Sequence, residues 1–383
     1  MMAGLLFARA GLHTVVLEKH GDFLRDFRGD TVHPSTLNLF DELGLLDVLL
    51  ARPHDRVERI GAVVGGREFR IADFRHLPGR GRFIAMMPQW EFLDFVADAA
   101  RGYPSFELRM DARVDGLVER EGRVEGVRLA NGETVEARLV IAADGRGSVL
   151  RAAAELPLRD LGAPIDVFWF RVPKARTPEN RTQGYIDRGE MIVAIDRGDY
   201  FQGARVIAKG GAEAVRARGI GDFRADVAAT APVMAEGVSA LAGWDDIKLL
   251  SVSLDRLERW SRPGLLAIGD AAHAMSPVAG VGINLAIQDA VAAANILAAP
   301  MTRGDDPDPL LPHVQRRRML PVRVIQGMQR IAHARVIGVA LGGTVRPPAV
   351  LRLLDRVPLF QRIPARMIGL GVRREHIRSP EAG

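Results

Sequence analysis

Residues 265–289, LLAIGDAAHAMSPVAGVGINLAIQD, contain the pattern that decides the fold. The apolar run at its start is typical of a buried parallel strand, and Asp270 follows directly. A carboxylate at that place lies at the carboxyl edge of a sheet, where open α/β folds bind ligands, and it suits a polyol or ribose hydroxyl. Gly280 and Gly282 remove side chains where backbone must approach a flat ring. A helix that begins near Gly282 directs free N–H groups at that ring, so the segment predicts a site for an electron-rich or anionic heterocycle.

A second strand end has the same character. Residues 139–143, LVIAA, are followed by Asp144 and Gly145, with Ser148 and Arg151 shortly after. The glycine lets the chain turn sharply beside a ligand. An ordinary strand-to-turn ending explains this segment equally well when it is taken alone. Chance is a poor explanation for the whole spaced set of the longer motif.

The amino-terminal segment predicts a third contact. Residues 2–9 suggest a helix closed by Gly11, and residues 13–18 form a short β-branched strand that ends in Glu18. In a dinucleotide-binding fold such an acid accepts hydrogen bonds from the adenosine ribose, about 20 residues after a glycine-rich loop. Counting back from Glu18 passes Met1, and no G-x-G-x-x-G is present. We expect a mis-assigned start codon with roughly a dozen or more residues upstream; a real loss of the loop, and a plain surface carboxylate for Glu18, are the alternatives.

The remaining pattern predicts an α/β fold in which a Rossmann-like nucleotide-binding domain, without its first strand and GxGxxG, is interrupted by a β-rich insertion and followed by a helical tail. We expect the nucleotide-binding domain at 1–56, 86–155 and 256–300, the β-rich domain at 57–85 and 156–255, and the tail at 301–383. The expected elements are helices at 35–50 and 89–101, a hairpin around Gly65-Gly66, a three-stranded meander over 113–143 that turns at Glu121-Gly122 and Asn131-Gly132, a helical stretch at 211–241, a long helix from about Gly282, and a tail with proline breaks at 347, 348, 358 and 364.

Composition excludes several classes of function. The 383 residues carry 52 basic and 47 acidic side chains, and the only basic run, Arg316-Arg317-Arg318, is interpreted as a solvated helix face rather than a nucleic-acid footprint. The absence of cysteine removes disulfides, thiolate metal sites and cysteine nucleophiles. No signal peptide or bilayer-spanning apolar run is visible, so a cytoplasmic protein without stable membrane insertion is expected.

The motifs resemble those of the para-hydroxybenzoate-hydroxylase-like family of FAD-dependent aromatic-ring monooxygenases, the group A flavin monooxygenases. Asp144-Gly145 resembles the D-G motif of that family, and residues 269–289 resemble its G-D-A-A-H…P…G-x-G-x-N…D motif. Residues 87–92, MPQWEF, are similar to a segment whose glutamine contacts the flavin side of FAD. The resemblance covers essentially the whole chain and departs from the family in the missing first strand and glycine loop.

This resemblance implies FAD as cofactor and an FAD-binding domain with an inserted substrate domain. It places Glu18 on the adenosine ribose, and it places Asp270 at the ribityl or pyrophosphate region. Gly282 and Asn284 would offer backbone N–H groups to the pyrimidine edge of the isoalloxazine. Arg28 would lie near the pyrophosphate, and Asp144 and Arg151 would support the FAD and nicotinamide region. The implied cofactor-binding residues are Glu18, Arg28, Gln89, Asp144, Gly145, Arg151, Gly269, Asp270, Pro277, Gly280, Gly282, Ile283 and Asn284.

The implied activity is hydroxylation of an aromatic or polyketide-like small molecule with NAD(P)H and O2, through a C4a-hydroperoxyflavin. No catalytic residue is singled out and no metal site is expected, since His33 and His273 have no second ligand at metal spacing and are interpreted as local hydrogen-bonding residues. A reductase or dehydrogenase of the same fold, and an inactive truncated flavoprotein, remain alternatives.

Aromatic residues of the insertion are ambiguous. The run Phe168-Trp169-Phe170 is more often core, although Trp169 points opposite to its neighbours on a strand and can line a cavity. Tyr185 and Tyr200 fit either a phenol contact or an ordinary sheet position. In the tail, the amphipathic stretches 336–341 and 359–370 suggest packing or a homodimer surface, with peripheral membrane contact as a minor alternative.

Overall fold

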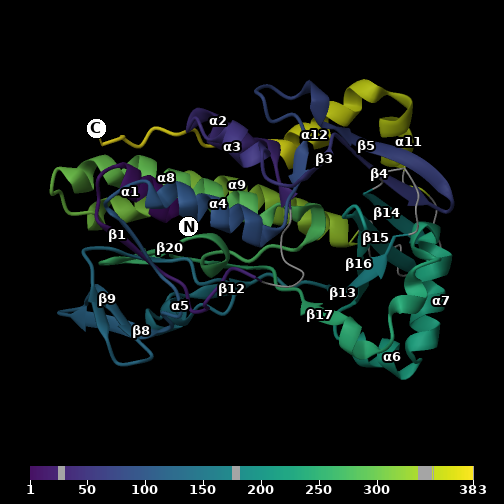
Figure 1. The fold of residues 1–383 in the computed structure, drawn as a ribbon, viewed down its shortest axis with the longest axis horizontal. Coiled ribbons are helices and arrows are strands. Elements are labelled where there is room, and N and C mark those ends of the chain that lie inside the picture. Colours follow the sequence, from purple (N-terminus) through teal and green to yellow (C-terminus); the bar gives the residue numbers. More distant parts are fainter. Residues whose placement is uncertain (25–30, 175–181, 335–346, 348, 383) are drawn as a thin grey trace.

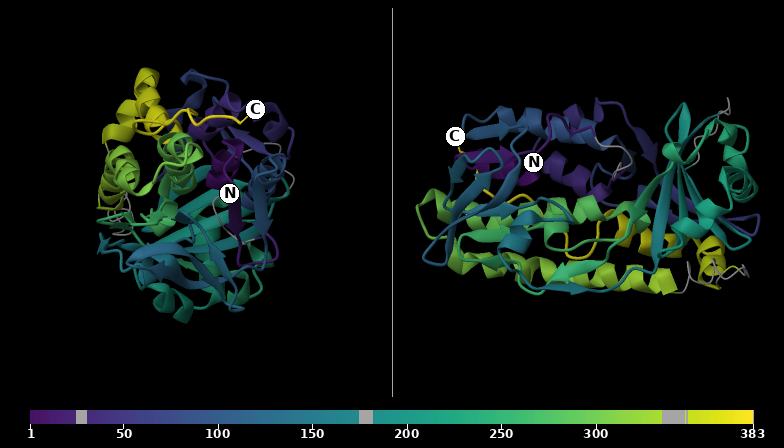
Figure 2. Two further views of the ribbon diagram at one scale, coloured as in Figure 1. Left: turned by 90° about the vertical axis from the view of Figure 1, so that its left-hand side faces the viewer. Right: turned by 90° about the horizontal axis from the view of Figure 1, so that it is seen from below.

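The structure is a computed structural model that describes residues 1–24, 31–174, 182–334, 347 and 349–382. Long helices cross the molecule above a set of short strands, and a larger sheet with its own helices lies at one end (Figure 1). The view from below shows the same separation of the two strand-containing parts (Figure 2, right). The predicted α/β class is confirmed.

Two parallel strand pairs form the nucleotide-binding part. β1 (Thr14–Leu17) pairs with β7 (Phe106–Arg109), and β11 (Val140–Ala142) pairs with β20 (Leu265–Ala267). β19 (Ser261–Arg262) adds an antiparallel neighbour to β20. Among the described residues the two pairs belong to separate sheets. Within each pair the carboxyl ends lie at the same edge, as parallel strands require.

The meander differs from its prediction in its last strand. β8 (Val114–Arg120) and β9 (Arg123–Leu129) turn at Glu121-Gly122, where both residues have positive φ. β10 (Thr134–Glu136) pairs with β9 and then ends. The prediction of one continuous third strand is wrong, because the N–H of Val140 bonds the carbonyl of Gly264 at 2.9 Å and so starts β11 in another sheet.

A seven-stranded sheet forms the other end of the molecule, and the predicted hairpin at Gly65-Gly66 belongs to it. Both glycines have positive φ, 56° and 76°, as a tight hairpin between twisted strands requires. The strands, in spatial order, are β17 (Lys248–Ser251), β13 (Ile165–Pro173), β16 (Tyr200–Ala208), β15 (Glu190–Asp196), β14 (Gln183–Asp187), β4 (Arg59–Val64) and β5 (Arg67–Asp73). Strands from residues 59–73 and from residues 165–251 therefore share one sheet, whereas the domain boundaries themselves stay a prediction.

The two faces of this sheet have different neighbours. Phe168 and Phe170 pack with Phe223 of α7 (Ile220–Thr230), which together with α6 (Ala212–Ala217) covers the outer face. Trp169 points to the other face and packs in a cluster with Val278. Trp169 therefore points opposite to its neighbours, as expected for a strand, whereas its lining of a cavity stays a prediction. Tyr185 is buried with the outer cluster as a core residue.

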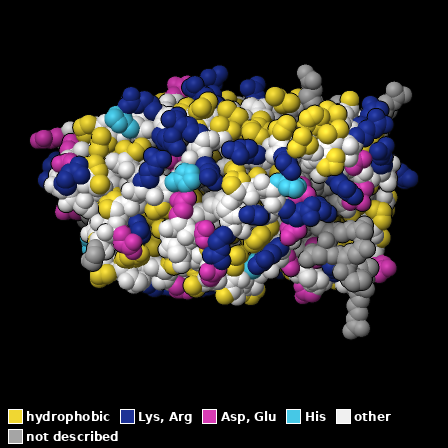
Figure 3. Space-filling view, turned by 90° about the horizontal axis from the view of Figure 1, so that it is seen from above, with side chains coloured by type: hydrophobic (Ala, Val, Ile, Leu, Met, Phe, Trp, Pro, Cys, Tyr) yellow, Lys and Arg dark blue, Asp and Glu magenta, His cyan; other side chains and the backbone are white. Residues whose placement is uncertain are grey.

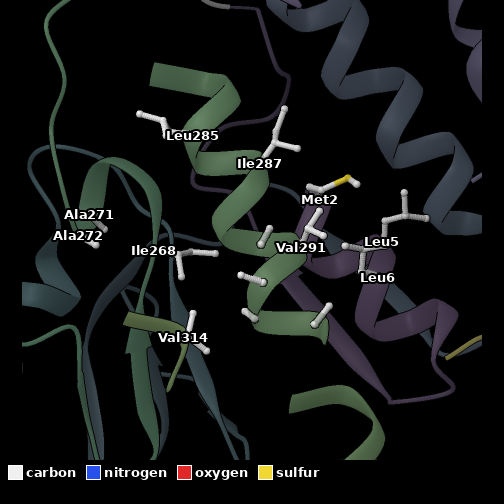
Figure 4. Packing of buried hydrophobic residues seen from close by; sticks show 14 of the residues in the cluster. Met2, Leu5, Leu6, Ile268, Ala271, Ala272, Leu285, Ile287, Val291 and Val314 are labelled. Atoms are coloured by element: carbon white, nitrogen blue, oxygen red, sulfur yellow. The ribbon is translucent and has the colours of Figure 1, made fainter. Parts of the chain in front are cut away.

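The largest core lies around α8 (Gly282–Thr302). Met2, Leu5 and Leu6 of α1 (Met2–Arg9) face Val291 of this helix (Figure 4). α4 (Gln89–Arg101) and α9 (Leu311–Ala332) add further apolar side chains to the same core. The stretch Val278–Thr302 is long and apolar enough to cross a bilayer, but 72% of its most apolar window is buried in the fold, as expected for a core helix.

Two helix predictions need correction. The helix expected at 35–50 is split into α2 (Pro34–Glu42) and α3 (Leu46–Leu50), because Gly44 adopts a φ of 72° that ends the first helix. The predicted break at Pro364 does not occur. This proline lies in the first turn of α12 (Arg362–Gly369), where its missing N–H costs no helical hydrogen bond.

The tail after α9 contains α11 (Ala349–Arg356), the 3₁₀ turn η9 (Pro358–Gln361) and α12. Ala365 and Leu370 are buried in a cluster with the β5 side of the sheet, whereas Leu359 and Ile363 are exposed by 59% and 63%. The stretch 359–370 therefore packs on one side only. Hydrophobic side chains gather in the upper part of Figure 3, with Lys and Arg side chains interspersed. The stretch 336–341 lies outside the described residues.

Candidate functional site

The strands that precede Asp144 and Asp270, β11 and β20, lie side by side in the structure. Ala142 and Ala267 are register partners, and the N–H of Ile268 donates to the carbonyl of Ala142 at 3.0 Å. Beyond them, Arg146 Nε lies 3.1 Å from Asp270 Oδ2. This ion pair joins the first loop, residues 143–148 after β11, to the second loop, residues 268–281 after β20. Sequence reasoning missed Arg146; its place directly after Asp-Gly was the available signal.

Asp144 and Arg151 shape the first loop. The carboxylate of Asp144 accepts hydrogen bonds from the Ser148 hydroxyl and from the N–H of Leu150, at the start of α5 (Val149–Ala153). Arg151 donates to the carbonyls of Arg146 and Ala271, at 2.7 and 3.3 Å. Both side chains therefore hold loop backbone in place, and any contact they make with a cofactor remains a prediction.

Glycine is required at two positions of the second loop. Gly269, in the 3₁₀ turn η5 (Gly269–Ala271), has a φ of 59°, and an added Cβ would lie 2.9 Å from the Cβ of Ala286. Gly280 has a φ of 62°, and its Cβ would meet Thr31 Oγ1 at 2.5 Å. At Gly282 a Cβ would make only an ordinary contact. Packing within the described chain therefore does not require glycine at position 282, and its contact with a cofactor stays a prediction.

The first turn of α8 offers hydrogen-bond donors. Among the described residues, the backbone N–H groups of Gly282, Ile283 and Asn284 have no acceptor. The Asn284 side chain is fully used: its oxygen accepts from the His33 N–H and the Thr36 hydroxyl, at 3.0 and 2.7 Å. Its NH2 group donates to the carbonyls of Thr31 and Gly280, each at 3.3 Å. A rigid helix start with free N–H groups and a positive dipole end favours an electron-rich or anionic partner.

Asp289 of α8 fixes the start of the second loop by a hydrogen bond. This buried carboxylate accepts from the Gly269 N–H at 3.1 Å and contacts His273 Nε2 at 2.6 Å and Arg318 Nε at 2.8 Å. Burial favours a raised pKa, yet His273 and Arg318 more than offset it and hold the Asp289 pKa below its usual range. His273 is thus a local hydrogen-bonding residue, as predicted. The interpretation of Arg316-Arg317-Arg318 as a solvated face is wrong for Arg318, which is fully buried.

Gln89 and His33 lie on the neighbouring elements. The side-chain oxygen of Gln89, at the start of α4, is buried and has no hydrogen-bond partner among the described residues. A buried polar atom without a partner is costly and points to a ligand. His33 bonds the Ile368 carbonyl through Nδ1, and burial lowers its pKa to about 4. Within the described chain no group of His, Asp and Glu could hold a metal ion.

Glu18 and Arg28, the two remaining predicted cofactor contacts, are not brought to the β11–β20 strand ends by strand pairing among the described residues. Glu18 follows β1, and its Oε1 accepts from the His20 N–H at 3.1 Å. Because β1 and β20 are in separate sheets, their pairing does not bring Glu18 beside Asp270. Arg28 lies outside the described residues.

The inner face of the seven-stranded sheet approaches the second loop. Val278, next to Pro277, packs in one cluster with Trp169 and Val193. The indole Nε1 of Trp169 is buried and has no hydrogen-bond partner among the described residues. Gly184 on the same face leaves its Cβ position almost open. This arrangement provides an apolar wall with one free donor.

Comparisons with known proteins show the family of this chain. The model of the FAD binding domain family matches residues 1–327. The 6-methylpretetramide 4-monooxygenase of Streptomyces rimosus is 31% identical over 388 residues, which cover 98% of this chain and 90% of that protein. The ubiquinone hydroxylase UbiL of Rhodospirillum rubrum is 25% identical, over 88% of this chain and 79% of that protein.

Solved structures share the fold. PqsL of Pseudomonas aeruginosa superposes with a TM-score of 0.76 at 22% identity, over 89% of this chain and 95% of that one. The anhydrotetracycline hydroxylase OxyS of Streptomyces rimosus gives 0.72 at 21% identity, over 100% and 75%. The chain is therefore an oxidoreductase that belongs to the FAD binding domain family, among its FAD-dependent aromatic or polyketide monooxygenases.

Proposed function

We propose that this protein binds FAD between the strand ends and the start of α8 and hydroxylates an aromatic or polyketide-like compound, with NAD(P)H and O2 as co-substrates. The observation that carries this proposal is the link between the strand ends and the start of α8. Arg146 pairs with Asp270 at 3.1 Å and donates to the Met275 carbonyl at 3.3 Å, and the Cβ of Met275 lies 3.7 Å from the Cβ position of Gly282. The relatives named as monooxygenases and hydroxylases support the same assignment.

The residues present fit a flavin. At Gly282 a Cβ would make only an ordinary contact, 3.7 Å from the Cβ of Met275, and Gln89 presents a buried oxygen that lacks a partner among the described residues. We assign Asp270 to the polyol or pyrophosphate region, Glu18 to the adenosine ribose, and the N–H groups of residues 282–284 to the pyrimidine edge. The bound FAD would supply the hydride acceptor and the site of oxygen activation. The protein would orient it and stabilise negative charge at the helix start.

The inner face of the seven-stranded sheet is the proposed substrate wall. Trp169 and Val193 contribute partly buried apolar surface opposite Val278, and Gly184 leaves room beside them. A planar ring system is complementary to such a wall, and a carbonyl or phenolic oxygen on it could accept from Trp169 Nε1. The wall would also keep water from the reacting atoms. A cytoplasmic location and a homodimer belong to this proposal as well.

The experiment that tests the proposal is isotope incorporation. The purified protein is supplied with FAD, its absorbance spectrum is recorded, and turnover is followed with NADPH or NADH under 18O2 against a panel of polycyclic phenols and quinones. The proposal requires flavin absorbance in the protein fraction and one 18O atom in the product. NAD(P)H oxidation with a reduced product and no 18O would establish a reductase instead. A protein that takes up no FAD would refute the assignment of the site.

A further inference from the structure

A groove of about 460 Å³ lies outside the proposed flavin site, between α9 and the short antiparallel pair β12 (Leu158–Asp160) and β18 (Asp255–Leu257). Four arginines line it: Arg159, Arg256, Arg316 and Arg323. Glu258 is the one acidic residue of its lining, and Met319 and Pro312 contribute apolar surface. The groove therefore combines a strong positive charge with a partly apolar wall.

The arginines are placed so that they repel one another. Arg159 and Arg256 are register partners in the β12–β18 ladder, and like charges directly opposite on paired strands are destabilising. Arg316 and Arg323 are seven residues apart on α9, so they lie along one side of the helix. Arg330 extends the same row by another seven residues. Three elements thus direct positive charge toward one place.

These charges are not neutralised within the described part of the chain. None of these arginines takes part in an ion pair there, although ion pairs between Arg and Asp or Glu are numerous elsewhere on the surface. Arg256 donates only to the Gln326 side-chain oxygen, at 3.0 Å. Burial, together with Arg323, Arg159 and Arg330, lowers the pKa of Arg256. The cluster therefore costs free energy that a bound anion would recover.

We propose that this groove binds a phosphate-bearing anion of the pyrophosphate type, held by the guanidinium groups of Arg159, Arg256, Arg316 and Arg323. Guanidinium forks match phosphate oxygens in pairs, and several of them around one cavity favour a multiply charged anion over a single carboxylate. Met319 and Pro312 suit an organic group attached to the phosphates. The source is either free pyrophosphate or the phosphates of a nicotinamide dinucleotide. The assignment stands independently of the flavin chemistry proposed above.

A direct binding measurement tests the proposal. Inorganic pyrophosphate is titrated into the protein by calorimetry at a constant ionic strength of about 0.15 M, where unspecific surface attraction is screened. We expect saturable binding, and we expect R159Q/R323Q to weaken it by at least tenfold, since each charge-assisted hydrogen bond lost costs roughly that factor. R113Q is the matched control, because Arg113 is exposed and outside the groove. It should leave the affinity unchanged.

Thermal unfolding distinguishes loss of binding from loss of fold. Removing like charges relieves repulsion, so R159Q/R323Q should keep or raise the Tm of the unliganded protein. Pyrophosphate should raise the Tm of the wild type and of R113Q, and it should raise the Tm of R159Q/R323Q much less. Competition with NADPH or NADH then identifies the source: displacement of pyrophosphate points to the dinucleotide, and its absence to the free anion. Absence of saturable binding, equal affinity in the double variant, or an equal loss in R113Q would overturn the proposal.

Discussion

Arg318 Nε donates to Asp289 Oδ1 at 2.8 Å, and both side chains are completely buried. The other oxygen of the same carboxylate accepts from the Gly269 N–H. The pair therefore ties α9 to α8 and to the strand end that carries Asp270. Forming a buried ion pair gains little net free energy, but removing one partner leaves an uncompensated buried charge.

Replacing Arg318 by methionine should lower the free energy of unfolding by about 3 to 5 kcal/mol, because Asp289 loses its permanent cation. Urea unfolding followed by circular dichroism measures the change. Arg316, two residues earlier and exposed, provides the control, and R316M should stay within about 0.5 kcal/mol of the wild type. Equal effects of the two substitutions would show that burial of Arg318 does not matter.

The Arg316-Arg317-Arg318 run shows where sequence reasoning ends. Composition identifies a basic helix segment, but the burial of one arginine depends on Asp289, 29 residues away in sequence, and on the tail residue Glu375. These ion pairs form only when distant parts of the chain pack together, so no local sequence pattern specifies them. The motif around Asp270 was predictable, because strand, glycines and helix start are adjacent in the chain.

His33 should make stability depend on pH. Burial lowers its pKa from the usual 6.5 to about 4, with the Ile368 carbonyl opposing the shift. Between these values the unfolded chain binds a proton that the folded chain does not, so stability is complete above about pH 6.5 and falls as the pH drops to about 4. The gap corresponds to about 3 kcal/mol.

The measurement is urea unfolding of the wild type and of H33N at pH 7.5 and at pH 5. The variant lacks the titrating imidazole, so its loss of stability between the two pH values should be smaller. H376N is the control, since His376 is partly exposed and its imidazole pairs with Glu42 instead of being buried. An identical pH dependence in wild type and H33N would contradict the assignment.

Gly280→Ala should abolish or strongly weaken FAD uptake. The new Cβ meets Thr31 Oγ1 at 2.5 Å, and the φ of 62° is unfavourable for alanine by roughly 1 to 2 kcal/mol. Flavin absorbance after gel filtration measures the result. Gly327→Ala is the matched control, because that Cβ meets nothing within 4 Å and Gly327 lies within α9. Normal FAD content in G280A would show that the packing of this loop against Thr31 is not needed for FAD uptake.

The fold was predictable where local chemistry decides it and not where pairing does. Gly65-Gly66 indicated the hairpin, since both positions need positive φ. The transfer of residues 140–142 to a new sheet was not predictable, because it depends on β20, more than a hundred residues later. Glu18 and Arg28 keep their cofactor roles as predictions.

Trp169→Phe distinguishes the contribution of the aromatic ring to substrate binding from that of the hydrogen-bond donor Nε1. Phenylalanine keeps an apolar ring on the inner face but removes Nε1, which is buried without a partner among the described residues. For a substrate whose oxygen accepts from Nε1, KM should rise by roughly two- to tenfold, because one neutral hydrogen bond contributes about 0.5 to 1.5 kcal/mol. A substrate that lacks this oxygen should be unaffected. Trp244→Phe is the control, since Trp244 packs on the opposite face with Phe168 and Phe223. If both substitutions change KM alike, or if W169F affects all substrates equally, the inner face is not the substrate wall.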